Sequence, residues 1–449
     1  MLLNFTDITL STKGQLYLEL YNQIKKAVAD GILKKGEKLP SVREAASQLG
    51  VSRTTVENAY TRLCIEGIAE SLPQRGYYII GLPKSQYTAP TVNIPQPEIL
   101  YDFSSRLVDA ASSDTDLWKK LVRSVLWDSG ELNSYGDPQG ELCLRKALAD
   151  YSYKARGVTT SAHNIVIGAG VGPLLNILCG LIGRDITVGF ENDGFEVARR
   201  IFSDYGITTF NLDSDGAGAT EKSLIDTNPD ILFLLPSALS KISPTALSGR
   251  RNYLSSWLND KNRLIIEDDY NGELRYTAHS IPAFQRKAPH RTVYIGSFSK
   301  LLLPSVRIAY MVLPDFLAER FGSLSKIYNQ TCGKIEQLTL EKYIVTGALE
   351  KHLKKLRRLY YTKSQLLIRK LEENLEYFKS ATLFESSLTV SIALTRKIEP
   401  EKFMVECYKK GLRIAKIKDN STLMLCFAGI ATEKIENGVN LLNIILKNM

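Results

Sequence analysis

The sequence has few of the residues from which metal centres and disulfide frameworks are built. Its 449 residues include six cysteines and four histidines. No cysteine pair has CxxC spacing and no histidine pair has HxH or HxxxH spacing, so a zinc site is not expected. The dispersed cysteines are expected to be reduced thiols rather than disulfides, as is usual in the cytoplasm.

Long hydrophobic runs are also missing. No stretch of about 18 apolar residues occurs, so we expect no transmembrane helix and no membrane partner. The N-terminal sequence MLLNFTDITL lacks the basic and apolar regions of a secretory signal. These features favour a cytoplasmic protein, and the chain length predicts two or three domains.

The N-terminal part of the chain lacks a strong excess of positive charge. Residues 1–80 contain ten Lys or Arg residues and eight Asp or Glu residues, although the whole chain has a net charge of +9. The overall charge allows a polyanionic partner but does not indicate one. A DNA-binding function must therefore be argued from the positions of individual basic residues.

The N-terminal segment nevertheless has the element order of a winged helix-turn-helix domain. Apolar residues at every fourth position predict an amphipathic helix over residues 15–33. A capping box of Ser41 and Glu44 predicts the start of a second helix, and Ser52 predicts the start of a third. Residues 68–80 contain a turn between two short strands, which predicts the hairpin of the wing.

In a helix-turn-helix, the first residues of the second helix of the motif face base edges in the major groove. Arginine can form two hydrogen bonds with guanine, and hydroxyl groups can bind phosphates or base edges. Arginines on the preceding helix and at the wing tip are placed to bind phosphates or to enter the minor groove. A winged helix that binds protein is the alternative from the pattern alone. The candidate DNA-binding residues are Ser52, Arg53, Thr54, Thr55, Arg43 and Arg75.

The rest of the chain divides by composition. Residues 81–98 contain four prolines and few bulky aliphatic residues, which is typical of an extended linker. Beyond them, apolar runs such as NIVIG and ILFLLP alternate with helical stretches, which predicts a largely parallel sheet covered on both faces. A long basic helix and a mixed segment follow, which predicts a small α+β subdomain. The predicted divisions are a winged-helix domain (1–80), a linker (81–98), a large domain (99–340) and a small C-terminal subdomain (341–449).

Lys300 follows an apolar strand, TVYIGS, within the segment GSFSK. Pyridoxal phosphate requires a lysine amine for the Schiff base, a carboxylate beside its pyridine nitrogen and a pocket for its phosphate. Ser297, Ser299 and Arg307 could donate hydrogen bonds to phosphate oxygens. Ser297 and Lys300 also have the SxxK spacing of β-lactamases, but the SDN and KTG segments of those enzymes are absent.

Two further segments could complete such a site. The strand RLIIED delivers three consecutive acids and then Tyr270, so a carboxylate could face the ring nitrogen and the phenol could bind the 3-oxygen of the ring. Gly168–Gly172 is a glycine-rich turn from a strand into a helix, where backbone N–H groups favour phosphate. This turn matches neither the Walker A nor the Rossmann pattern, and alone it is equally consistent with an ordinary tight turn.

The combination of segments resembles a known family. KLPSVREAASQLGVSRTTVENAYTRLCIEG, followed by QRGYYI, is similar to the N-terminal domain of GntR-type regulators over residues 12–80. From residue 99 to 449 the chain resembles fold-type I aminotransferases, and the fusion resembles the MocR subfamily. The matching segments are YGDPQGELCLRKALADY, IIEDDYNGELRY, YIGSFSKLLLPSVRIAY and GALEKHLKKLRRLYY. This resemblance implies a multidomain protein, with a winged helix-turn-helix followed by an α/β PLP-dependent aminotransferase fold with a small α+β subdomain.

The resemblance also implies roles for individual residues. Lys300 would be the Schiff-base lysine, Asp268 would pair with the pyridine nitrogen and Tyr270 would contact the 3-oxygen. Tyr135 would reach the phosphate from the other subunit of a homodimer, and Phe195 would stack on the cofactor ring. The phosphate would be held by the backbone amides of Gly170 and Val171 and by the side chains of Ser297, Ser299 and Arg307.

Three positions depart from the family pattern. The segment LRLGFA, whose arginine binds the substrate carboxylate, becomes LMLCFA with Met424 in place of that arginine. A second arginine found in one relative is replaced by Val197. The family's HQxPTG segment becomes ALSKIS over residues 238–243. Lys241 or a nearby arginine is the candidate cation for a carboxylate in place of the missing arginines. A buried carboxylate without a cation costs several kcal/mol, so an ordinary amino acid is not the expected ligand.

Three functions are consistent with the sequence. The first is a regulator that binds an operator in double-stranded DNA and senses either pyridoxal phosphate itself or an amine or peptide-like effector. The second is an active aminotransferase with an attached DNA-binding domain. The third is a repressor whose second domain has lost the cofactor and serves only in dimerisation. The fused winged helix and the missing carboxylate arginine favour the first, without enzymatic turnover.

Overall fold

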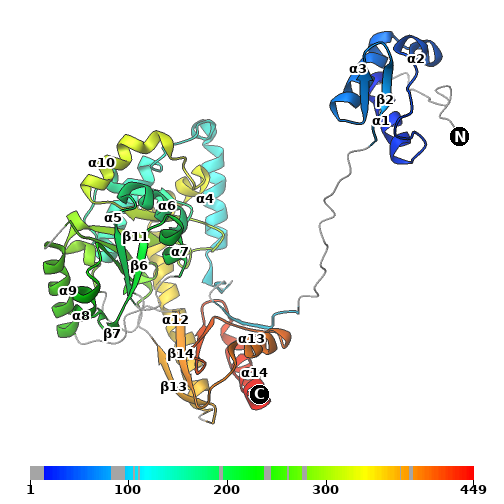
Figure 1. The fold of residues 1–449 in the computed structure, drawn as a ribbon. Helices are drawn as coiled ribbons and strands as arrows, with labels where there is room; N and C mark the ends of the chain where they lie inside the picture. Colours follow the sequence, from blue (N-terminus) through cyan, green and yellow to red (C-terminus); the bar gives the residue numbers. More distant parts are fainter. Residues whose placement is uncertain are drawn as a thin grey trace. The chain divides into compact units, whose positions relative to one another are not determined.

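The computed structural model describes residues 15–81, 97–104, 107–109, 112–191, 196–236, 244–259, 262–275, 281–374, 376–383 and 388–449. The chain divides into two compact units, Met1–Pro95 and Gln96–Met449 (Figure 1). In the described ranges, no helix combines the length and the apolar character needed to cross a membrane.

The N-terminal unit is a three-helix domain with a β-hairpin, and it confirms the predicted winged helix-turn-helix. Its core consists of fully buried apolar side chains from α1 and α3, including Leu20, Ile24, Val56, Tyr60 and Leu63. The elements are α1 (Leu16–Ala29), α2 (Val42–Leu49), α3 (Arg53–Ile65), β1 (Ala69–Leu72) and β2 (Gly76–Ile79).

Local signals set the helix ends of this unit. The Ser41 hydroxyl accepts a hydrogen bond from the Glu44 N–H (3.2 Å), and α2 ends at Gly50 in the left-handed conformation. The first helix is shorter than the predicted 15–33. It stops at Ala29 because Gly31 has a φ of 74°, which turns the chain away from the helix axis.

The second unit contains a seven-stranded mixed sheet in the order β4-β12-β11-β10-β9-β5-β6. Five neighbouring strands, from β11 to β6, are parallel, and β12 is antiparallel to both of its neighbours. One edge of this sheet therefore contains the carboxyl ends of the parallel strands, the end of β4 and the start of β12. The strands are β4 (Ile165–Gly168), β5 (Thr187–Glu191), β6 (Thr208–Leu212), β9 (Ile231–Leu234), β10 (Leu264–Asp268), β11 (Thr292–Ser297) and β12 (Ala309–Val312).

Both faces of this sheet are buried, as the apolar runs predicted. Ile266 belongs to a cluster with α6 and α10, whereas its neighbour Ile265 belongs to a cluster with α9. The helices of this part are α4 (Thr115–Trp127), α5 (Leu142–Arg156), α6 (Val171–Ile182), α7 (Glu196–Asp204), α8 (Glu221–Thr227), α9 (Pro244–Asn259), α10 (Asp315–Leu324) and α11 (Lys334–Val345). A short hairpin joins β7 (Ser214–Asp215) to β8 (Gly218–Ala219).

The long helix α12 (Ala348–Glu372) leads from this region to a four-stranded antiparallel sheet in the order β13-β14-β17-β16 (Figure 1). Its strands are β13 (Phe378–Leu383), β14 (Thr389–Leu394), β16 (Lys416–Lys418) and β17 (Thr422–Cys426), accompanied by α13 (Pro400–Lys409) and α14 (Ile435–Lys447). The strand β3 (Tyr101–Phe103) pairs in parallel with β15 (Leu412–Ile414). The start of the second unit therefore packs with its C-terminal part.

Candidate cofactor site and DNA-binding surface

Four predicted cofactor residues lie at the ends of strands on one edge of the large sheet. Asp268 ends β10, Ser297 ends β11, Gly170 follows β4 and Arg307 precedes β12. In open α/β sheets, ligands bind outside the carboxyl ends of the parallel strands. The topology thus collects at one edge residues that are up to 137 positions apart in the sequence.

Three of the predicted phosphate-binding residues contact one another. Arg307 Nη1 donates to Ser299 Oγ (3.2 Å), and the Ser299 N–H donates to Ser297 Oγ (3.3 Å). Gly170 has a φ of 101° and precedes the first residue of α6, Val171. A Cβ atom at Gly170 would lie 2.5 Å from Arg307 Nη2, so a side chain there would displace the guanidinium, and the φ of 101° is strained for any residue other than glycine. The N–H groups at a helix start and an arginine together favour a phosphate-sized anion.

The three consecutive acids have different surroundings. Glu267 accepts hydrogen bonds from the backbone N–H groups of Phe284 (2.7 Å) and Gln285 (2.9 Å). Asp269 pairs with Arg156, with 2.6 Å between Nε and Oδ2. Within the described ranges, Asp268 has no hydrogen-bonding or ionic partner, although its side chain is buried and Oδ1 is inaccessible to solvent.

The unpartnered carboxyl group of Asp268 has a perturbed pKa. Burial, and secondly the charge of Asp269, raise the pKa of Asp268 to about 7. A buried carboxylate without a counter-charge is unfavourable, and a cation bound beside it would remove this penalty. The protonated ring nitrogen of a pyridine cofactor is such a cation.

Lys300 lies in the turn after β11 and is half-buried. Burial lowers the pKa of its amine, while the nearby Cys426 thiol on β17 acts in the opposite direction. A lower pKa increases the fraction of neutral amine, which is the nucleophilic form. Tyr270 follows β10 and packs, half-buried, against the same apolar cluster as Val171.

The remaining predicted cofactor and effector residues are not brought into this cluster. Tyr135 is fully exposed on the surface of the described unit. Val197 is exposed at the start of α7, and Met424 is half-buried on β17. Phe195 and Lys241 lie outside the described residues.

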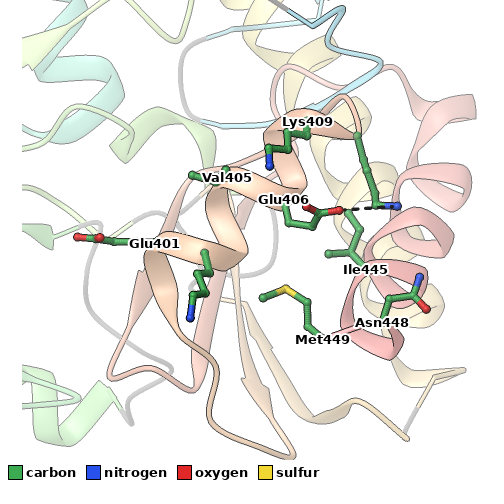
Figure 2. A pocket seen from close by; sticks show the side chains of 9 residues that line it. Glu401, Val405, Glu406, Lys409, Ile445, Asn448 and Met449 are labelled. Atoms are coloured by element: carbon green, nitrogen blue, oxygen red, sulfur yellow. Dashed lines mark ion pairs between the residues drawn. The ribbon is translucent and has the colours of Figure 1, made fainter.

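The pocket drawn in Figure 2 is not this site. It lies between α13 and α14 and contains the ion pair of Glu406 with Lys410 (3.8 Å). Acidic, basic and apolar side chains all line it, and none of the predicted site residues is among them. Its mixed lining does not point to a particular ligand.

The predicted DNA-binding residues lie on the surface of the N-terminal unit. Arg43, Arg53 and Arg75 are exposed, and within the described ranges none of them forms an ion pair. Ser52 has a structural contact in addition, because its hydroxyl caps α3 by accepting from the Thr55 N–H (3.1 Å) and lies 2.8 Å from the Thr55 hydroxyl. Arg53 and Thr54, also at the start of α3, have no such side-chain contact with any residue that the structure describes.

Comparison with known proteins agrees with this arrangement. Residues 16–79 match the model of the gntR family of bacterial regulatory proteins. The chain is 31% identical over 440 residues to the HTH-type transcriptional regulator YdeL of Bacillus subtilis, covering 94% of this chain and 95% of that protein. The chain is a MocR-type member of the GntR family of transcriptional regulators. It is also 30% identical over 348 residues to the pyridoxine biosynthesis regulator PdxR of Corynebacterium glutamicum (76% of each chain), and 24% identical to the probable rhizopine catabolism regulatory protein MocR of Rhizobium meliloti (95% and 92%).

Solved structures show the fold of the regulator's second unit. An archaeal alanine:glyoxylate aminotransferase matches with a TM-score of 0.69 at 20% identity, covering 78% of this chain and 91% of that chain. The α-aminoadipate aminotransferase LysN of Thermus thermophilus matches with a TM-score of 0.66, also at 20% identity, covering 78% and 92%. The predicted aminotransferase fold is therefore confirmed, as is the prediction of a DNA-binding regulator.

Sequence reasoning did not identify three residues of the regulator that contact the site residues from other parts of the fold. Arg156 neutralises Asp269 across 113 positions of sequence, and Cys426 reaches Lys300 from the C-terminal sheet. His352 on α12 contacts the turn of Lys300. No local spacing connects these residues with their partners, because tertiary folding alone brings them together.

Proposed function

We propose that this MocR-type regulator binds pyridoxal phosphate at the sheet edge and that cofactor binding changes its affinity for operator DNA. The buried and unpartnered carboxyl group of Asp268, beside the Gly170–Arg307–Ser299 cluster, is the observation that carries the proposal. LysN, which has the same fold, was solved in complex with N-(5'-phosphopyridoxyl)-L-leucine.

Each residue has a defined part in this proposal. Lys300 would hold the cofactor through its amine, and the cofactor aldehyde would supply a covalent and reversible link there. Asp268 pairs with the protonated ring nitrogen, and Tyr270 binds the 3-oxygen. Arg307 donates to the phosphate, together with Ser299, Ser297 and the N–H groups at Gly170 and Val171.

A homodimer is part of the proposal. Tyr135 is fully exposed and Trp127 is 89% exposed, and these two aromatic residues flank the short 3-10 helix Ser129–Asn133. Large exposed aromatic side chains are typical of interfaces. We infer that this surface meets a second copy of the chain and that Tyr135 reaches the phosphate site of that copy.

Pyridoxal phosphate itself is the effector that we propose. Met424 and Val197 offer no positive charge for an amino-acid carboxylate, so the half of the site that would hold a free amino acid is missing. Cofactor binding shifts the equilibrium between two arrangements only if one of them binds it more tightly. The aminotransferase fold makes turnover a second candidate function, and release of an oxo acid from any amino-acid donor would reveal it.

Operator binding measured with and without pyridoxal phosphate tests this function. We expect operator affinity to change on the order of tenfold when the cofactor is added, as for a typical coupling between two sites. An unchanged affinity would contradict the proposed effector. For comparison, amino acids, dipeptides and amines are added one at a time to the cofactor-bound regulator, and its absorbance spectrum and operator binding are measured. If a simple α-amino acid alters both the spectrum and operator binding, another basic residue, Lys241 first, must hold its carboxylate.

Cofactor affinity should depend on pH through Asp268. Its pKa is raised to about 7, so a growing fraction of the free protein is protonated as the pH falls below that value. The protonated acid cannot pair with the ring cation, and affinity should therefore decrease below about pH 7 and level off above it. Equilibrium dialysis at several pH values measures this.

The Asp268→Ala variant provides the control for the pH profile. The free cofactor titrates identically in both experiments, so the difference between the two profiles isolates the contribution of Asp268. The variant should bind more weakly at high pH and lose the step near pH 7. Parallel profiles for the two proteins would show that Asp268 does not face the ring nitrogen.

A further inference from the structure

Backbone hydrogen bonds fix the turn that carries Lys300. The Phe298 N–H donates to the Ile308 carbonyl (3.0 Å), and the Phe298 carbonyl accepts from the N–H groups of Leu301 (3.1 Å) and Leu302 (2.9 Å). The turn is thus anchored at Phe298, whose side chain is buried. The carbonyl of Leu301, directly after Lys300, faces α12.

His352 on α12 contacts that carbonyl. Its Nε2 atom lies 2.8 Å from the Leu301 oxygen, and the His352 side chain is only 5% exposed. A carbonyl oxygen can only accept a hydrogen bond, so Nε2 must carry the proton. Burial lowers the pKa of His352, partly opposed by this bond and by Asp114, so the ring is neutral at neutral pH. The His352 ring packs edge-on against the Tyr343 ring, with 6.3 Å between the ring centroids, and this contact restricts its orientation.

The helix α12 also holds the neighbouring turn. Arg357 Nε donates to the Glu273 carbonyl (2.7 Å), in the short helix that follows Asp268 and Tyr270. Two contacts that are five residues apart on one helix therefore reach the turns after both β10 and β11. These turns carry the carboxylate and the amine of the proposed cofactor site.

We propose that His352 is a positioning residue for Lys300, which it holds at the cofactor site through the Leu301 carbonyl. The inference deepens the proposed function, since it rests on Lys300 as the cofactor lysine. A donor-free side chain at position 352 releases the turn, so the Lys300 amine becomes more exposed to water. Its pKa then moves back toward the ordinary value of a lysine, since burial is what lowers it.

The position of Lys300 can be measured without cofactor. The full-length apoprotein is treated with an amine-reactive reagent over a range of pH, and modification of Lys300 is followed by peptide mass spectrometry. His352→Phe, which keeps a ring but has no donor, should shift the pH midpoint of Lys300 modification upward, toward that of the exposed lysines in the same digest. His352→Gln should restore the wild-type midpoint, because the amide N–H₂ can donate from a similar position.

The controls separate positioning from folding and from the proposed function. Lys351→Ala changes an exposed neighbour on the same helix and should behave like the wild type. His352→Leu is a second donor-free variant for the case in which His352→Phe does not fold, as judged by thermal unfolding. A His352→Phe profile equal to that of the wild type, or a His352→Gln profile equal to that of His352→Phe, would overturn the inference. If the wild type takes up no pyridoxal phosphate, the proposed function fails, while the labelling result still decides the role of His352.

Cofactor release gives the second readout. Dissociation of pyridoxal phosphate should be about tenfold faster from His352→Phe than from the wild type, and close to the wild-type rate in His352→Gln. Equal rates in all three proteins, together with equal labelling, would assign His352 a purely structural role.

Discussion

Lys300→Ala is expected to abolish the absorbance band of the covalent link between the regulator and pyridoxal phosphate. The covalent link to the aldehyde requires a neutral amine at the sheet edge, and Lys300 is the half-buried lysine in the turn after β11. Burial lowers its pKa, so a larger fraction of the amine is reactive at neutral pH than for an exposed lysine. Absorbance spectra and borohydride reduction followed by peptide mapping measure the effect.

Lys326→Ala is the matched control for this prediction, since Lys326 is exposed in the same unit. It should retain the absorbance and the reducible adduct. The Lys300 variant should keep its operator affinity in the absence of cofactor but no longer respond to added pyridoxal phosphate. If a reducible adduct persists in Lys300→Ala, the covalent link forms at another lysine and the prediction is wrong.

Features encoded within a few residues could be predicted from the sequence. The caps at Ser41 and Ser52 depend on a hydroxyl and an N–H three positions later, and both are present. The order of the cofactor segments was also predicted. Asp268 ends β10, Lys300 follows β11 and Arg307 precedes β12, so each segment lies beside a strand that its apolar run indicated. Continuous apolar runs predicted a sheet buried on both faces, because a strand with helices on each side has no polar face.

Features that depend on distant partners could not be predicted in this way. The three acids at the end of β10 are equivalent as a local pattern, and only the family resemblance pointed to Asp268. In the structure, Asp269 pairs with Arg156 and Glu267 accepts from two backbone N–H groups. The pairing of β3 with β15 joins segments about 300 residues apart, each three residues long. Strands this short have too weak a pattern to reveal a partner.

The largest effect expected in the N-terminal unit is that of Arg53→Ala on operator recognition. Arg53 begins α3, is exposed and forms no ion pair within the described residues, so its guanidinium is available for a base edge. Loss of a two-bond contact with guanine should cost about 1–3 kcal/mol of specific binding and relax the preference at one base pair. Binding to the operator and to variants mutated at single positions measures both effects.

Arg43→Ala provides the contrast within the same domain. Arg43 lies near the start of α2, the first helix of the motif, where a phosphate contact is expected. Its loss should weaken binding to specific and nonspecific DNA alike and reduce the salt dependence by about one phosphate contact. The two variants therefore differ in kind, one in sequence preference and the other in salt slope. Operator affinity that is insensitive to both would mean that this winged helix presents another face to DNA or binds protein, because α3 could not then be the helix that reads the bases.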